Sequence, residues 1–147
     1  MTKNTKPSAY AVPPGVGTVL IPGRVLLRIS AQQTDDAFEV IELAGPEGDG
    51  PPPHIHLDRH ELFYVLQGTV EFSVGQDMIA AEAGSLVFVP RNTRHGFKFG
   101  PDCKVLGLVA PAGLEGFFRE LGAGMAAGKS QTEIRDALEG RYDSHPA

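Results

Sequence analysis

Three features are scarce in this sequence of 147 residues: cysteines, clusters of basic residues and long apolar runs. Cys103 is the only cysteine, which excludes an internal disulfide, and we expect an unreactive thiol in a reducing compartment. The 13 lysines and arginines do not cluster and the net charge is −5, which argues against nucleic-acid binding. No apolar run approaches the length of a membrane span, and none follows the N-terminal lysines as a signal peptide requires. These absences predict a cytoplasmic protein with neither nucleic acid nor membrane as partner.

Glycine and proline are abundant, with 18 and 12 residues, and they separate short apolar segments. This pattern is typical of antiparallel strands joined by tight turns, and about ten strands predict an all-β jelly roll of two sheets. The dipeptide Gln67-Gly68 predicts a two-residue hairpin turn between its flanking strands. The main predicted strands are Thr18–Ile21, Val25–Ile29, Phe38–Leu43, Glu61–Leu66, Thr69–Val74, Met78–Ala81, Ser85–Val89, Phe97–Phe99 and Val105–Val109.

Three regions of different character divide the chain. Residues 1–16 contain prolines that block regular structure and read as a flexible arm, and residues 17–112 hold the predicted strands of a barrel domain. Residues 113–147 form a helical extension, because apolar residues recur at helical spacing and Ser130–Glu133 is a capping box. We expect two short helices whose apolar faces pack on the outside of the barrel in a structural role.

The histidines carry the clearest chemical signal. His54 and His56 are one residue apart, so in a strand their side chains point the same way and converge on one metal ion. Glu61 begins the next strand, taken here as an antiparallel neighbour, and His95 opens a later one. Three imidazoles and one carboxylate suit iron, manganese, nickel, cobalt or zinc rather than calcium or magnesium. The alternative is structural histidines bonded to backbone carbonyls.

Other polar residues near this set allow different roles. Glu61 is either a metal ligand or a general base. His60 points to the opposite face and reads as an exposed turn residue, with replacement of Glu61 as a ligand as the alternative. His145 lies in a polar tail and is expected to be solvated. Arg91 and Arg94 flank His95 and are expected to be solvated turn residues, unless they reach the mouth of the site.

Apolar residues on the predicted strands suggest two further surfaces. Phe63 and Phe97 are candidates for the wall of a substrate pocket, although filling the core is the default for a phenylalanine. Leu62, Tyr64 and Leu66 form an apolar face directed outward. Either other elements cover that face or it is a homodimer interface.

Two spaced patterns resemble the motifs of the cupin family. Residues 48–68 read Gly48-x5-His54-x-His56-x4-Glu61-x6-Gly68, and residues 84–95 read Gly84-x5-Pro90-x-Asn92-x2-His95. The departures are Asn92, where glycine is common, and Phe99, where asparagine is frequent. The resemblance covers residues 17–121, and the whole chain is similar to small one-domain cupins of the quercetin dioxygenase-like group, including the stretch APAGLEGFFRELG.

The resemblance implies a double-stranded β-helix barrel with one divalent transition-metal ion held by His54, His56, Glu61 and His95. It favours a metal-dependent dioxygenase acting on a small phenolic or enol-like molecule, with Glu61 as the catalytic base. Two other classes share the same fold and ligands, a binding or sensing cupin without turnover and a metal-dependent isomerase or hydrolase. The sequence leaves the native metal and the substrate open.

Overall fold

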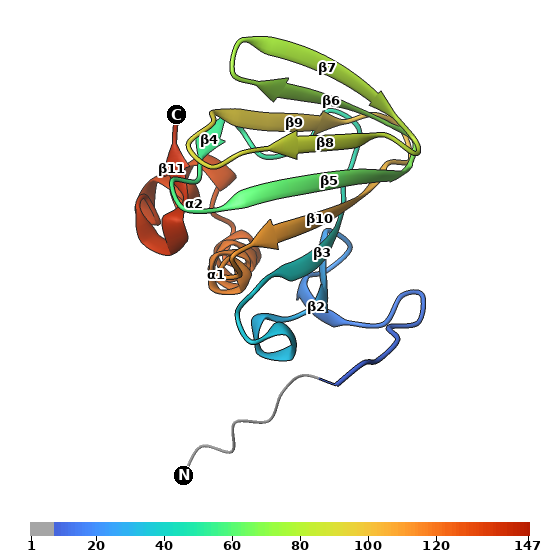
Figure 1. Ribbon diagram of the computed structural model, residues 1–147. Helices are drawn as coiled ribbons and strands as arrows, with labels where there is room; N and C mark the ends of the chain where they lie inside the picture. Colours follow the sequence, from blue (N-terminus) through green and yellow to red (C-terminus); the bar gives the residue numbers. More distant parts are fainter. Residues whose placement is uncertain (1–7) are drawn as a thin grey trace.

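The computed structural model describes residues 8–147, and it contains two antiparallel sheets that face each other (Figure 1). This arrangement is the predicted all-β jelly roll. The six-stranded sheet has the spatial order β1 (Thr18–Ile21), β2 (Val25–Ile29), β3 (Glu39–Ala44), β10 (Lys104–Ala110), β5 (His60–Gln67) and β8 (Leu86–Val89). The five-stranded sheet has the order β11 (His145–Pro146), β4 (His54–Ile55), β9 (His95–Phe99), β6 (Thr69–Val74) and β7 (Asp77–Glu82).

The core lies between the two sheets and is built by strict alternation along the strands. In β5, Glu61, Phe63 and Val65 are buried while Tyr64 and Leu66 are exposed, as the sequence predicts. Aromatic rings from both sheets meet at the centre of this core. The ring of Phe63 in one sheet lies 5.3 Å from that of Phe72 and 5.5 Å from that of Phe97 in the other.

The predicted hairpin at Gln67-Gly68 is wrong, because β5 and β6 belong to different sheets. β5 pairs with β10 and β8, whereas β6 pairs with β9 and β7. Gly68 makes the corner between the sheets with φ of +74°, and a Cβ there would lie 2.7 Å from the Cys103 sulfur. Both strands bury one face in the same core from opposite sides. Buried and exposed residues therefore alternate along them as they would along the two strands of a hairpin. The two-residue hairpin joins β6 to β7, where Val74 pairs with Asp77.

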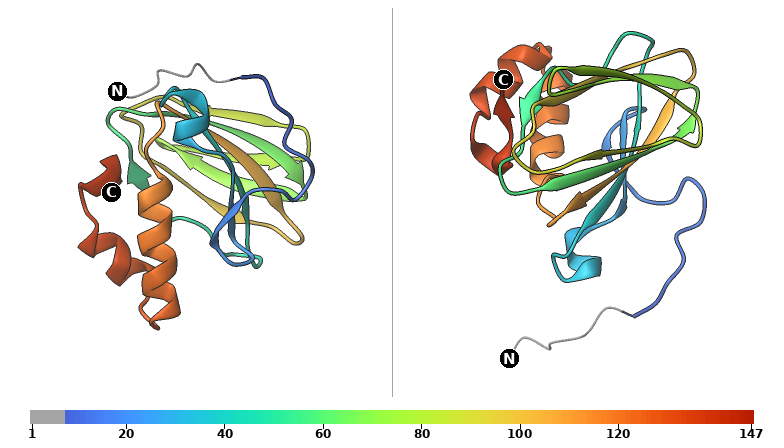
Figure 2. Two further views of the ribbon diagram at one scale, coloured as in Figure 1. Left: turned by 90° about the horizontal axis from the view of Figure 1, so that it is seen from below. Right: turned by 45° about the horizontal axis from the view of Figure 1, so that its top comes forward.

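The C-terminal residues form helix α1 (Glu115–Ala126), helix α2 (Gln131–Ala137) and a short 3₁₀ turn, η2 (Arg141–Asp143), before β11. The two helices lie together on one side of the sheets (Figure 2). One of the two hydrogen bonds of the predicted capping box is present, since the Ser130 hydroxyl accepts a hydrogen bond from the Glu133 amide. The tail is more ordered than expected, because β11 adds a strand to β4.

The N-terminal region is only partly described. The predicted arm begins with residues 1–7, which lie outside the described residues, and residues 8–16 contain neither helix nor strand. Arg28 donates hydrogen bonds to the carbonyls of Val12 and Pro13, which ties this segment to β2. A second 3₁₀ turn, η1 (Ala31–Thr34), connects β2 to β3. Among residues 8–147, no helix has the length and apolar character needed to cross a membrane.

Candidate metal centre

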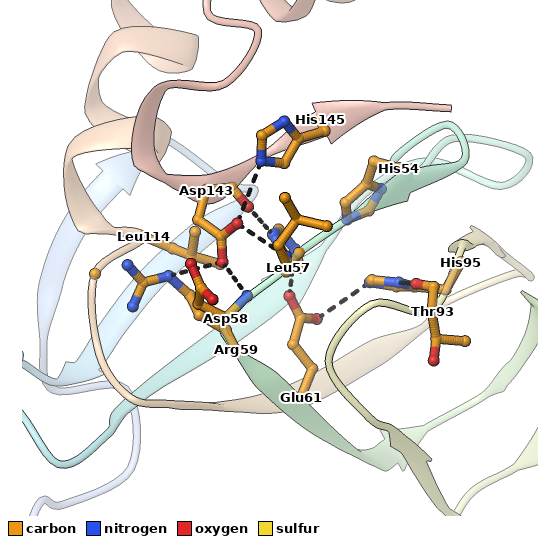
Figure 3. A network of polar contacts seen from close by, with 12 residues as sticks. His54, Leu57, Asp58, Arg59, Glu61, Thr93, His95, Leu114, Asp143 and His145 are labelled. Atoms are coloured by element: carbon orange, nitrogen blue, oxygen red, sulfur yellow. Dashed lines mark hydrogen bonds and ion pairs between the residues drawn. The ribbon is translucent and has the colours of Figure 1, made fainter.

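The structure brings His54, His56, Glu61 and His95 together at one end of the core (Figure 3). One nitrogen or oxygen atom from each residue lies within 4.8 Å of those from the other three, and all four residues are buried. His54 on β4 pairs directly with His95 on β9, and His56 follows β4. The expectation that Glu61 lies on an antiparallel neighbour of this strand is wrong. Glu61 reaches across the core from β5 in the opposite sheet.

Glycines allow the segment before β4 to run close beside β9. The backbone of Gly50 has φ of +148°, and a Cβ there would lie 2.1 Å from the carbonyl oxygen of Phe97. A Cβ on Gly96 would lie 2.9 Å from the carbonyl oxygen of Pro51. Only glycine permits this approach. This close approach places His54 opposite His95.

All three histidines use one ring nitrogen in the same way. Each Nδ1 lies 2.8 Å from a backbone carbonyl oxygen, and because a carbonyl only accepts, each Nδ1 carries the proton. The other nitrogen, Nε2, faces the cluster in each ring and offers its lone pair to a metal ion when it carries no proton, which is the usual arrangement of a metal-binding histidine. The carbonyl bonds that a structural role would use are thus present, but they leave Nε2 available. The pairs are His54 with Pro52, His56 with Asp143 and His95 with Thr93.

Glu61 is the anionic member of the cluster. One carboxylate oxygen lies 2.7 Å from Nε2 of His56 and the other 3.7 Å from Nε2 of His95. Burial opposes ionisation of Glu61, but the hydrogen bond from His56 and the nearby imidazole of His95 outweigh it and hold the pKa of Glu61 well below its ordinary value. Burial also opposes protonation of His56, yet the bond to Glu61 and its charge raise the pKa of His56.

The remaining two histidines lack such a bonded partner. Burial, together with the charges of His95 and His56, lowers the pKa of His54 to about 3, so its imidazole is neutral at neutral pH. Nε2 of His95 is buried without a hydrogen-bond partner. A buried nitrogen lone pair without a partner is costly, and a cation beside it removes that cost. The cluster therefore fits a divalent transition-metal ion for two reasons. Its nitrogen and oxygen atoms are suitable ligands, and one buried nitrogen lacks a hydrogen-bond partner.

Asp143 is a supporting residue that the sequence did not reveal. Its carboxylate accepts hydrogen bonds of 2.8 Å from the amides of Leu57 and Asp58, just after His56, and lies 3.7 Å from Arg59 (Figure 3). Its own carbonyl oxygen holds His56. Asp143 is 87 residues away from His56, and no spacing pattern connects the two. The C-terminal turn thus orients one of the four clustered side chains.

The cluster opens into a cavity with about 760 Å³ of atom-free space, part of it open to solvent. Phe63 and Phe97, the predicted wall residues, both line it. The helices do more than pack against the barrel, because Phe117 and Leu121 of α1 and Arg135 of α2 also line this cavity. Their apolar spacing predicted buried helix faces, but it carried no information about which surface those faces cover.

The other candidate residues lie outside the cluster. His60 points away from Glu61, and its Nδ1 accepts a hydrogen bond from the Arg91 amide. Arg91 and Arg94 are exposed, as expected. The prediction of a solvated His145 is corrected, because His145 is half-buried in β11 and lies 3.3 Å from Asp143.

The lone cysteine is also accounted for. Cys103 is buried, and its thiol lies 2.7 Å from the Thr69 carbonyl oxygen to which it donates. This environment agrees with the unreactive thiol expected from the sequence.

Comparison with known proteins places this geometry in context. Residues 41–106 match the family described as Cupin domain. Quercetin 2,3-dioxygenase of Bacillus subtilis (strain 168) is 35% identical over 116 residues, which is 77% of this chain and 34% of that protein. Quercetin 2,3-dioxygenase of Aspergillus japonicus is 32% identical over 94 residues, 58% of this chain and 27% of that protein. The chain thus matches about a third or less of the length of these curated relatives.

Solved structures share the fold at lower identity. Pac13, a nucleoside dehydratase from Streptomyces, has a TM-score of 0.57 at 21% identity, covering 71% of this chain and 84% of that one. KdgF from Halomonas sp. has a TM-score of 0.54 at 22% identity, covering 64% of this chain and 84% of that one. These similarities support the jelly-roll architecture alone.

Proposed function

The chain is a cupin similar to the quercetin 2,3-dioxygenases, and from this premise we propose that it is a metal-dependent dioxygenase acting on a small phenolic or enol-like molecule. The observation that carries the proposal is the buried cluster of three histidines and one glutamate, whose three Nδ1 atoms are all held by backbone carbonyls. The shorter match to the Aspergillus japonicus protein and the similarity in fold to solved structures do not carry the proposal.

We propose that His54, His56, Glu61 and His95 hold one divalent transition-metal ion. Such an ion supplies Lewis acidity and coordination positions for a substrate oxygen and for dioxygen. The carbonyl bonds fix the orientation of each imidazole and direct its Nε2 toward the cluster. The neutral state of His54 at neutral pH also suits it for coordination.

The cavity residues act on the substrate in two ways. Glu61 lines the cavity, and its carboxylate is the group that we propose accepts the proton of a substrate hydroxyl. Phe63 and Phe97 line the same cavity and are buried, so their rings offer an apolar surface for a planar substrate and exclude water.

Metal content and oxygen uptake test this proposal. We expect about one equivalent of metal in the purified protein, and oxygen consumption with a member of a flavonol and catechol panel after loading with iron, manganese, nickel or cobalt. His95→Gln should lose both properties. His60→Gln is the matched control, because His60 lies next to Glu61 but faces away from the cluster, and it should keep both. No uptake with any of these metals would contradict the proposal.

Glu61 has two proposed roles that one variant separates. Glu61→Gln retains an oxygen ligand but cannot take up a proton at neutral pH. If Glu61 acts mainly as a base, this variant keeps its metal and loses turnover, whereas a ligand role predicts that the metal is lost as well.

Two outcomes would assign the cluster to another class. Thermal stabilisation by a small molecule without any product would indicate a binding or sensing cupin. Product formation under argon would indicate a reaction that consumes no oxygen, as in an isomerase or a hydrolase.

We also propose that the chain forms a homodimer through the outer face of the six-stranded sheet. Tyr64 pairs with Leu86, and Leu62 pairs with Phe88, which places four apolar side chains in one patch. Leu86 and Phe88 are 65% and 58% exposed, respectively. A patch of this kind is rare on a monomer, and an apolar patch is complementary to a copy of itself.

A further inference from the structure

The wall of the cavity contains one charged group without a partner among residues 8–147. Arg24 and Asp49 form an ion pair with each other, and Glu61 is bonded to His56. Arg135, on α2, makes neither a hydrogen bond nor an ion pair with any described residue. The charge of Arg135 is therefore not balanced by the protein around the cavity.

The position of Arg135 is well suited to contact a bound molecule. Its guanidinium carbon lies 5.3 Å from the centre of the Phe117 ring, and its buried Nε has no hydrogen-bond partner. His54 and Arg135 line this cavity together, and both also line a second pocket beside Pro52. Burial lowers the pKa of Arg135 to about 10, which leaves it a cation at neutral pH.

Comparison with two other arginines shows that, of the three, Arg135 alone lacks hydrogen bonds and ion pairs with the described residues. Arg28 and Arg59 also have a buried Nε without a hydrogen bond. However, Arg28 donates to two backbone carbonyls and lies 3.6 Å from Glu42. Arg59 donates to the carbonyls of the segment before α1 and lies near Asp143. Both of these guanidinium groups bind oxygen atoms of the fold, whereas that of Arg135 lies over the Phe117 ring and binds no oxygen atom of residues 8–147.

Arg135 is half-buried, its Nε is buried without a hydrogen bond and it forms no ion pair among residues 8–147, so an anion in the cavity would meet an unbalanced positive charge. We propose that Arg135 binds a carboxylate of the substrate, while another oxygen of the same molecule faces the metal cluster. This inference rests on the proposed function and narrows its substrate class to a phenol or enol that bears a carboxylate. A guanidinium matches a carboxylate in two-point geometry, and one cation balances one carboxylate, whereas a phosphate dianion would need more.

Binding measurements with two matched probes test the proposal. Zinc-loaded protein is titrated calorimetrically with catechol and with 2,3-dihydroxybenzoate, which differ by the carboxylate. We expect the acid to bind at least about tenfold more tightly than catechol to the wild type. Arg135→Met should abolish this preference while leaving catechol affinity unchanged, and Arg135→Lys should keep part of it. The matched control is Arg119→Met, an exposed arginine of α1 paired with Glu115, which should keep the full preference.

Several results would overturn the proposal. Equal affinity of the wild type for the two probes would do so, as would equal weakening of both probes in Arg135→Met with a lower melting temperature, which indicates a structural role. We expect Arg135→Met to keep its zinc and to melt at about the same temperature, because the half-buried guanidinium forms no hydrogen bond or ion pair among residues 8–147 that the variant would lose.

Failure of the proposed function would look different. In that case the wild type would bind no metal or consume no oxygen. The carboxylate preference would still be measurable, because the acid should raise the melting temperature of metal-free wild type and not that of metal-free Arg135→Met.

Discussion

Glu39 is a fully buried acidic side chain that lies outside the metal cluster. One of its oxygens accepts hydrogen bonds from the amides of Gly113 and Leu114, immediately before α1. Glu39→Ala leaves both amides without a partner and opens a void, so we expect a loss of about 2–4 kcal/mol in the free energy of unfolding. Chemical denaturation measures it. Glu71→Ala, at an exposed position of β6, should change it by less than about 0.5 kcal/mol, and an equal loss there would contradict the assignment.

His56 gives the metal affinity a defined dependence on pH. Its pKa is raised above the ordinary 6.5, because the hydrogen bond that His56 donates to Glu61 outweighs burial. Below this raised pKa a metal ion must displace the proton on Nε2, so affinity should fall about tenfold per pH unit as pH falls. Above it, His56 adds no further dependence, and His54 stays neutral down to about pH 3.

Competition titrations with zinc between about pH 5.5 and 8.5 measure this dependence. An affinity that stays constant across that range would show that His56 is not a ligand. Replacing His145 with glutamine should leave the profile unchanged, because its ring contacts the Asp143 carboxylate and not the cluster.

At the residue scale, the sequence predicted the cluster well because spacing and strand alternation decide which side chains face inward. It could not explain the two departures from the cupin motifs. Asn92 has φ of +62°, and asparagine tolerates this left-handed conformation, so it replaces the usual glycine without a change of backbone. Phe99 packs 5.3 Å from Phe97 and lines the cavity, where it adds apolar wall.

At the scale of elements, η2 and β11 act on the metal cluster from the end of the chain. The Asp143 carboxylate holds the backbone that follows His56, and the Asp143 carbonyl orients the His56 ring. We expect Asp143→Ala to weaken metal binding about 10- to 100-fold, the usual cost of losing a group that orients a ligand. Competition with a chromogenic chelator measures this.

Asp136→Ala is the control for this prediction. Asp136 is an exposed acidic residue of α2 and has no bond to the loop after His56, so its removal should leave metal affinity unchanged. If both variants weakened binding equally, a general loss of negative charge would explain the result and the positioning role of Asp143 would be wrong.

Strand positions were predictable and strand partners were not. β1, β2 and β6 have the bounds that turn residues and apolar runs predict. Those signals are local, whereas pairing depends on which sheet each strand joins. Gly68 was therefore interpreted as a hairpin turn when it forms a corner. β11 has two residues, too few for any periodicity, and its pairing with β4 follows from the course of the preceding helices.

At the scale of the whole molecule, the two sheets present different outer faces to solvent. The outer face of the five-stranded sheet carries charge, since Glu71 pairs with Lys98 across β6 and β9. The outer face of the six-stranded sheet carries rows of apolar side chains instead. One row contains Val40, Leu108, Leu62 and Phe88 on four neighbouring strands. This difference makes the six-stranded sheet the face on which a second copy is expected to pack.

The dimer proposal predicts that one charge placed in this apolar patch separates the subunits. Leu86 is 65% exposed, so Leu86→Asp costs the isolated fold little, but at a dimer interface it buries an unpaired carboxylate. We expect sedimentation velocity to give twice the monomer mass for the wild type and the monomer mass of 15.7 kDa for this variant. Met78→Asp is the matched control, because Met78 is 63% exposed on the other sheet and should leave the dimer intact. A monomeric wild type at micromolar concentration would contradict the proposal, and the exposed row would then need a different partner, since burial of its leucines and phenylalanine is the only source of affinity that this face offers.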